Sequence, residues 1–125
     1  MLFRSSPSVS YSTRNGTYTK VGRMVTAFFD IITTSVSGGT GICIISGLPY
    51  VVKNGMGGYS VINWRDCSLI PAGAANTQLK GYAEQNNSYI VMQLDNSGTN
   101  GFGQTSNVST YSASGRMTGY ITYEV

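Results

Sequence analysis

The chain has 125 residues, the length of a single domain with one hydrophobic core. Only 10% of its residues are charged and its formal net charge is +3, so it lacks the dense basic character of a typical nucleic-acid-binding protein. It has no histidine and two cysteines, which excludes a Ser-His-Asp or Cys-His catalytic arrangement and a four-ligand zinc site. Its 41% hydrophobic content favours a folded domain over a polar disordered chain.

Basic residues are concentrated at the N-terminal end. Four of them precede the first acidic residue, Asp30: Arg4, Arg14, Lys20 and Arg23. We interpret residues 1–15 as a short basic arm with the first strand, and residues 16–125 as a β-sandwich domain. The arm is either a solvated terminus or a segment that docks on an acidic partner surface. The N-terminal sequence has no apolar core of a signal peptide, so we expect synthesis in a host cytoplasm and no membrane partner.

The first residues of the domain are typical of a β-hairpin. Residues 8–13 alternate between polar and apolar side chains, and Asn15-Gly16 follows them. A type I′ turn needs positive φ at both central residues, which Asn and Gly accept best. We therefore predict a turn at Asn15-Gly16 and a returning strand over residues 17–21.

The strongest strand patterns are apolar on both faces. Residues 24–34 and residues 89–95 carry apolar side chains at odd and even positions. Such strands are covered on both sides, by a second sheet or by another subunit. We take four residues of these strands as candidates for the core or a subunit interface: Phe28, Phe29, Ile90 and Met92.

The rest of the chain also has a period of two. We predict further strands at residues 42–46, 59–64 and 117–125, and a loop running into a strand at residues 74–85. Cys43 lies in the apolar run GICIISG, which predicts a buried free thiol. Residues 96–115 form a long polar, glycine-rich loop, a feature that is often functional. The fold class is all-β: a two-sheet antiparallel sandwich, jelly-roll-like, with about eight strands.

No motif indicates catalysis or cofactor binding. The five acidic residues are not paired in the sequence, and no phosphate-binding glycine loop is present. We expect no enzymatic activity, no metal and no cofactor. Tyr18, Lys20 and Arg23 suggest a single-strand-binding surface, but no second basic cluster completes a groove and Phe28 and Phe29 read as core residues, so we expect no nucleic-acid partner.

Three segments together resemble a small β-domain of bacteriophage structural proteins. They are YTKVGRMVTAFFDI, IISGLPY and the terminal GYITYEV, and within them residues 18–22, 45–50 and 119–123 match in order and spacing. The resemblance covers nearly the whole chain. It marks Tyr18, Gly22, Gly47, Leu48 and Pro49 as packing and turn positions. The family is similar to the trimeric β-sandwich modules of fibre tips, tail proteins and capsid-attached proteins.

The resemblance implies a virion protein that forms a homotrimer. Because only about 15 residues precede the β-domain, the chain looks more like a capsid decoration, or cement, protein than a long fibre. Its expected partners are then the major capsid protein and other virion proteins, contacted through Arg4, Arg14, Lys20 and Arg23. The alternative is a tail-fibre or receptor-binding tip that holds a host glycan on residues 96–115, where Tyr111 is suited to stacking on a sugar ring.

Overall fold

The computed structural model describes residues 2–3, 8–37, 43–55, 60–68, 77–96, 104–105 and 114–125. Within these ranges the chain forms β-strands and no helix. Seven strands have four residues or more, and two have only two residues. In chain order they are β1 (Leu2–Phe3), β2 (Ser8–Val21), β3 (Met24–Ser37), β4 (Cys43–Ser46), β5 (Ile62–Cys67), β6 (Thr77–Ala83), β7 (Tyr89–Asn96), β8 (Gln104–Thr105) and β9 (Gly115–Glu124).

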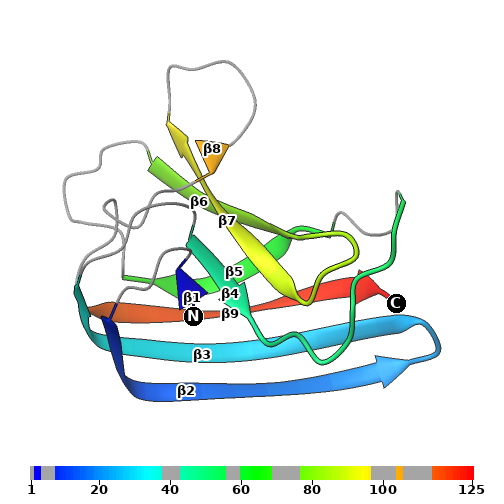
Figure 1. The fold of residues 1–125 in the computed structure, drawn as a ribbon, viewed down its shortest axis with the longest axis horizontal. Helices are drawn as coiled ribbons and strands as arrows, with labels where there is room; N and C mark the ends of the chain where they lie inside the picture. The colour runs from blue at the N-terminus through cyan, green and yellow to red at the C-terminus, as the bar shows by residue number, and fades with distance from the viewer. Residues whose placement is uncertain are drawn as a thin grey trace.

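The described strands form two antiparallel sheets that lie one above the other (Figure 1). The upper sheet has the order β1-β4-β7-β6, with β8 also paired to β7, and the lower sheet has the order β2-β3-β9-β5. Buried side chains from both sheets form one core cluster, including Ile31 and Met117 of the lower sheet and Cys43, Ile90 and Met92 of the upper sheet. The prediction of an all-β chain with two packed antiparallel sheets is confirmed.

Alternation along β3 and β9 produces the inner face of the lower sheet. Val25, Ala27 and Ile31 of β3 are buried, and the β9 residues paired with them, Tyr123, Ile121 and Met117, are fully buried. Directly opposed residues of antiparallel strands point to the same face, so each of these pairs adds to one continuous apolar layer. Phe28 lies between these positions, on the opposite face, and is 47% exposed.

The predicted hairpin turn at Asn15-Gly16 is wrong. Both residues lie inside β2, where Asn15 pairs with Asp30 and Gly16 with Phe29. The chain reverses instead at Gly22-Arg23, since Val21 pairs with Met24. Gly22 has a φ of 59° and fits the first central position of a type II′ turn, which glycine favours. The long pairing between β2 and β3 outweighs the local preference of Asn-Gly for a turn.

A local irregularity of β2 changes which of its side chains face the core. The register between β2 and β3 shifts on both sides of Tyr11, so that Tyr11 pairs with Thr33 and Thr13 pairs with Ile32. From Tyr11 to Thr13, β2 advances by two residues while β3 advances by only one, from Thr33 to Ile32, as in a β-bulge. The inward positions of β2 are odd-numbered up to Tyr11 and even-numbered from Arg14 onward.

Other sequence predictions agree with the structure or fall outside it. Strands occur at each predicted apolar run, although β5 extends beyond the predicted end at residue 64 and β3 reaches Ser37. Cys43 is buried as a thiol that is in no disulfide, and burial raises its pKa to about 12. Of the predicted 96–115 loop, only residues 96, 104–105 and 114–115 lie in the described part of the chain.

Replacing Gly119 with Ala is expected to destabilise the fold. A Cβ atom at this position would lie 2.4 Å from the backbone oxygen of Asn63 and 3.2 Å from the Phe29 ring. The backbone of β5 would have to shift, so we expect a loss of about 1–3 kcal/mol in the free energy of unfolding, measured by urea denaturation. Gly16→Ala is the control, because its nearest contact is an ordinary 3.5 Å. Equal effects of the two changes would contradict this account.

Candidate functional site

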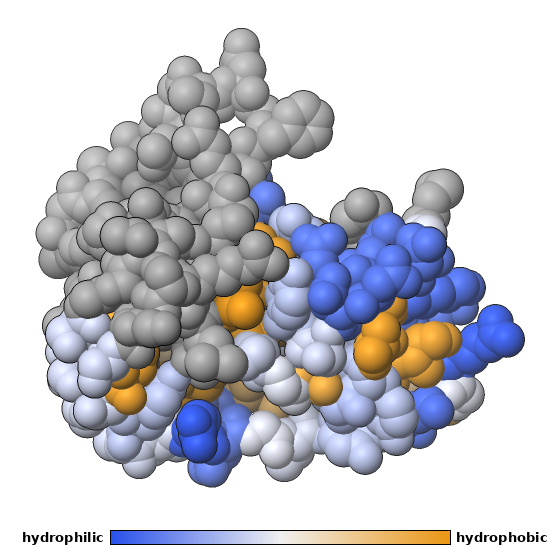
Figure 2. Space-filling view, viewed as in Figure 1, coloured by the Kyte–Doolittle hydropathy of each residue, from blue (hydrophilic) through white to orange (hydrophobic). Residues whose placement is uncertain are grey.

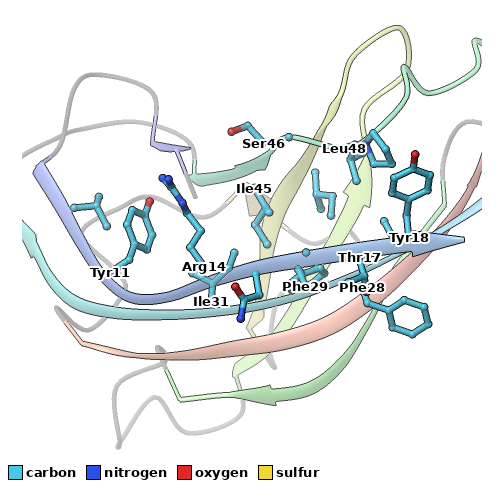
Figure 3. A pocket seen from close by; sticks show the side chains of 17 residues that line it. Tyr11, Arg14, Thr17, Tyr18, Phe28, Phe29, Ile31, Ile45, Ser46 and Leu48 are labelled. Atoms are coloured by element: carbon cyan, nitrogen blue, oxygen red, sulfur yellow. The ribbon is translucent and has the colours of Figure 1, made fainter.

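A groove opens on the described surface where the two sheets part. It has a volume of about 610 Å³, within the range of roughly 300–1,000 Å³ that ligand sites occupy. One side is β2, and the other is the end of β4 with residues 47–49 that follow it (Figure 3). Figure 2 shows apolar surface in a broken band above the β2–β3 hairpin, bordered by polar side chains. We call this feature the inter-sheet groove.

The floor of the inter-sheet groove is part of the hydrophobic core. Ala27 and Ile31 come from β3, Ile45 from β4 and Ile90 from β7, and each is less than a tenth exposed. The groove arises because β2 and β3 have 14 residues each whereas β4 has only four. The upper sheet therefore does not cover the whole length of β2. Where the cover ends, the hydrophobic core borders the groove.

The wall formed by β2 carries larger polar side chains. Arg14 pairs with Ile31 and Tyr18 pairs with Ala27, so both point to the inner side of the sheet. Tyr11 joins them because of the bulge that precedes Thr13. Figure 3 shows all three side chains rising from β2 toward the opposite wall, whereas the ring of Phe28, which also borders the groove, points away.

The opposite wall is held in place by backbone hydrogen bonds. The amides of Gly47 and Leu48 both donate to the Ser88 carbonyl, at 3.1 and 3.0 Å. Farther along, the Val52 amide donates to the Asn87 carbonyl and the Lys53 amide to the Glu124 carbonyl. The segment 47–53 therefore joins the β6–β7 turn of the upper sheet to the end of β9 in the lower sheet.

Three tyrosines from distant parts of the chain meet at one end of the groove. The buried Tyr123 hydroxyl accepts from the Tyr50 amide and donates to the Tyr50 carbonyl, both at 3.3 Å. The Tyr50 ring makes an edge-on contact with Tyr18, with ring centroids 5.7 Å apart, and the Lys20 ammonium lies 4.7 Å from the Tyr50 ring centroid. The three segments that carried the resemblance are thus in contact here.

The groove has one cationic side chain in otherwise neutral walls. Arg14 is the only charged residue among the described residues that line it, and its guanidinium lies 5.1 Å from the Tyr11 ring centroid. Burial raises the pKa of the Tyr11 hydroxyl, although nearby Arg14 opposes this. A side-chain hydrogen bond with Tyr50 raises the pKa of Tyr18. Both hydroxyls are therefore neutral near pH 7, and the groove favours an anion at Arg14.

The outer side of the lower sheet is a second candidate surface. Phe28 of β3 and Tyr120 of β9 are paired in the sheet, their ring centroids are 5.5 Å apart, and they are 47% and 42% exposed. Threonines surround them, including Thr26 and Thr122, which share a 2.9 Å hydrogen bond. Nothing in the described part of the chain covers this surface, which we call the outer face.

Ion pairs neutralise most of the charge on the outer face, where Asp66 of β5 also lies, opposite Thr118. Arg116 makes two hydrogen bonds to the Asp30 carboxylate, at 2.8 and 2.9 Å, and the Thr118 hydroxyl donates to the same carboxylate at 2.8 Å. The bonds from Arg116 and then Thr118 lower the pKa of Asp30. At the end of the sheet, Lys53 forms a 2.7 Å ion pair with Glu124. These pairs leave the face close to neutral at pH 7.

The basic residues that we expected to contact a capsid do not form one cluster. Arg14 lies in the inter-sheet groove, Lys20 lies on Tyr50, and Arg23 lies in the hairpin turn. Nine residues of extended chain, about 30 Å, separate Arg14 from Arg23. Arg4 lies outside the described residues, as does Tyr111 of the loop that we proposed for glycan binding.

Of the four positions predicted for the core or an interface, three pack in the structure and Phe28 does not, so its reading as a core residue is wrong. Ile90 and Met92 are fully buried, Phe29 is half-buried against Trp64, and Phe28 is exposed. Among the described residues no group of three or more potential metal ligands occurs. The same residues contain no helix long and apolar enough to cross a membrane.

Sequence reasoning did not find the inter-sheet groove. Tyr11 and Arg14 have opposite parity, so alternation alone places them on opposite faces, and only the bulge brings them together. Comparison of the chain with protein-family models, with curated proteins and with solved structures finds no match. The groove and the outer face are therefore the basis on which a function is inferred.

Tyr123→Phe is expected to loosen the wall of the groove. The change removes the hydroxyl that bonds to both backbone groups of Tyr50, and we expect a loss of about 1 kcal/mol in the free energy of unfolding, measured in urea. Tyr120→Phe is the matched control on the same strand, since its hydroxyl has no hydrogen bond to any described residue. If the two variants were equally stable, the anchoring role of Tyr123 would be refuted.

Proposed function

We propose that this chain is a bacteriophage virion protein that works by assembly and binding, without catalysis. In this proposal it forms a homotrimeric, jelly-roll-like β-sandwich that decorates and stabilises the capsid. A protein that binds only the assembled shell stabilises that shell by mass action. The motif resemblance supports the proposal, because its three segments meet around Tyr18, Tyr50 and Tyr123.

The observation that carries the proposal is the uncovered outer face. A β3 strand that is apolar on both sides suits a sheet covered on both sides, yet the described part of the chain covers only the inner side. Phe28 and Tyr120 together place two aromatic rings at the centre of the outer face. Exposed aromatic residues of this kind are typical of protein–protein contacts.

The occupant that best fits the outer face is another copy of the same chain. Asp30 is paired with Arg116 and Lys53 with Glu124, so the face is nearly neutral and does not repel an identical face. An acidic or a basic partner would gain little from it. Three copies can each turn this face toward a common threefold axis, and closed cyclic symmetry then limits the assembly to a trimer.

The double variant Phe28→Thr, Tyr120→Thr is expected to dissociate the trimer. Threonine keeps the strand preference, so the sheet is retained while the aromatic contact is lost. We expect the dissociation constant to rise by roughly tenfold or more, measured by sedimentation equilibrium of the full chain.

Val51→Thr is the control for this experiment. Val51 is 58% exposed but lies in the segment after β4, outside β3 and β9. The Val51→Thr change should leave the dissociation constant of the oligomer unchanged. Assembly through this face would be contradicted by a wild-type chain that is monomeric at all concentrations. It would also be contradicted by a double variant whose oligomer has the same mass in solution as that of the wild type.

The place of the protein in a phage particle tests the capsid role separately. Cryo-electron microscopy of purified virions with icosahedral averaging is expected to show many ordered copies over the shell. The absence of the chain from the shell, with a few copies at the tail, would reject capsid decoration.

A second candidate function is favoured by the inter-sheet groove. A tail-fibre or receptor-binding tip needs a recessed surface that recognises a host glycan, and the groove combines tyrosine side chains with one cation. Location of the chain at the tail, together with its binding to host cells, would favour this candidate over the capsid role. In both candidates the outer face forms the contact between copies.

A further inference from the structure

We infer that the inter-sheet groove binds an acidic oligosaccharide, with the ligand carboxylate at Arg14 and a sugar ring against Tyr18. This inference rests on the second candidate function and names its ligand and its site. It replaces the 96–115 loop as the location of glycan contact.

The position of Arg14 is the first argument for an acidic ligand. Its guanidinium lies over the Tyr11 ring in the mouth of the groove, and no acidic residue occurs among the described lining residues. A guanidinium presents parallel N–H donors that match the two oxygens of a carboxylate. Lys20, two residues beyond Tyr18 on the same side of β2, adds positive charge near the other end. The groove is thus electrostatically complementary to an anionic chain.

The tyrosines are the second argument, because they suit a sugar better than a lipid. Tyr11 and Tyr18 offer flat apolar rings together with hydroxyl groups, which matches the alternating C–H and O–H groups of a sugar ring. They lie seven residues apart on one wall, and Arg14 lies between them. The span from Arg14 to Tyr18 is about 13 Å along the strand, which accommodates a short oligosaccharide.

The edge of β2 is the third argument. Within the described residues β2 pairs only with β3, so one row of its backbone N–H and C=O groups borders the groove without a strand partner. Backbone groups in such a position can bond to sugar hydroxyls. Arg14 and Lys20 also have a purely structural alternative role, since inward-pointing charges on an edge strand prevent pairing with another strand.

The test uses the full chain and two matched pairs of probes. Trigalacturonic acid is compared with its methyl ester, and sialyllactose with lactose, by calorimetry and by amide NMR shifts. We expect at least one acidic probe to bind roughly tenfold or more tightly than its neutral partner and to shift amides of residues 11–18. Arg14→Gln should weaken that binding by roughly tenfold or more, and raised salt should also weaken it.

Arg23→Gln is the matched control, because it removes the same charge from the hairpin turn outside the groove. It should change the affinity by less than about twofold, and circular dichroism should show that both variants are folded. The inference is overturned if neither acid binds at millimolar concentration, if acid and neutral partners bind equally, or if Arg14→Gln promotes aggregation but leaves the affinity unchanged. Location of the protein on the capsid would reject the tip role. The binding experiment does not depend on that location, so its result would still decide whether the groove binds an acidic oligosaccharide.

Discussion

The buried hydroxyl of Tyr123 is the contact on which the shape of this protein most depends. It bonds to both backbone groups of Tyr50 and so fixes the segment 47–53 between the two sheets. The Ser88 carbonyl fixes the start of that segment, and the Glu124 carbonyl fixes its end. Because the segment is anchored to the upper sheet and to β9, it stands opposite β2 and does not pair with it. The space between them is the inter-sheet groove.

One strand serves both candidate surfaces. From Arg14 onward, the side chains of even-numbered residues of β2 point to the inner side of the sheet, and those of odd-numbered residues point to the outer side, where Thr19 lies beside Thr26. The groove and the outer face are therefore on opposite sides of the same sheet. In the proposed trimer, copies that meet through Phe28 and Tyr120 would leave Arg14 and Tyr18 on the other side of the sheet, although Phe28 and Thr17 also border the groove.

Alternation in the sequence was sufficient to predict an all-β chain with two antiparallel sheets and part of the core. It marked Ile90 and Met92 as core candidates, and the structure buries both, but Phe28, which was marked with them, is exposed. It failed at Asn15-Gly16, because a turn signal is local whereas the register of β2 is set by pairing with β3 over its whole length.

The candidate site was less accessible to sequence reasoning than the fold. The groove depends on the unequal lengths of β3 and β4, on a bulge near Ser12 and on contacts between Tyr18, Tyr50 and Tyr123. None of these is a local property of the sequence, since each needs the pairing partner of a distant residue. The motif resemblance marked the three segments that contain these tyrosines, but it could not say that they meet in space.

A crystal structure of the purified full chain is the most direct test of this division between an assembly surface and a binding surface. The account predicts three copies related by a threefold axis, in contact through Phe28 and Tyr120, with the mouth of the groove between Arg14 and Leu48 open to solvent. A groove filled by a strand from a neighbouring copy, with the outer face left bare, would contradict it. That result would make the groove the assembly site and remove the basis for a glycan there.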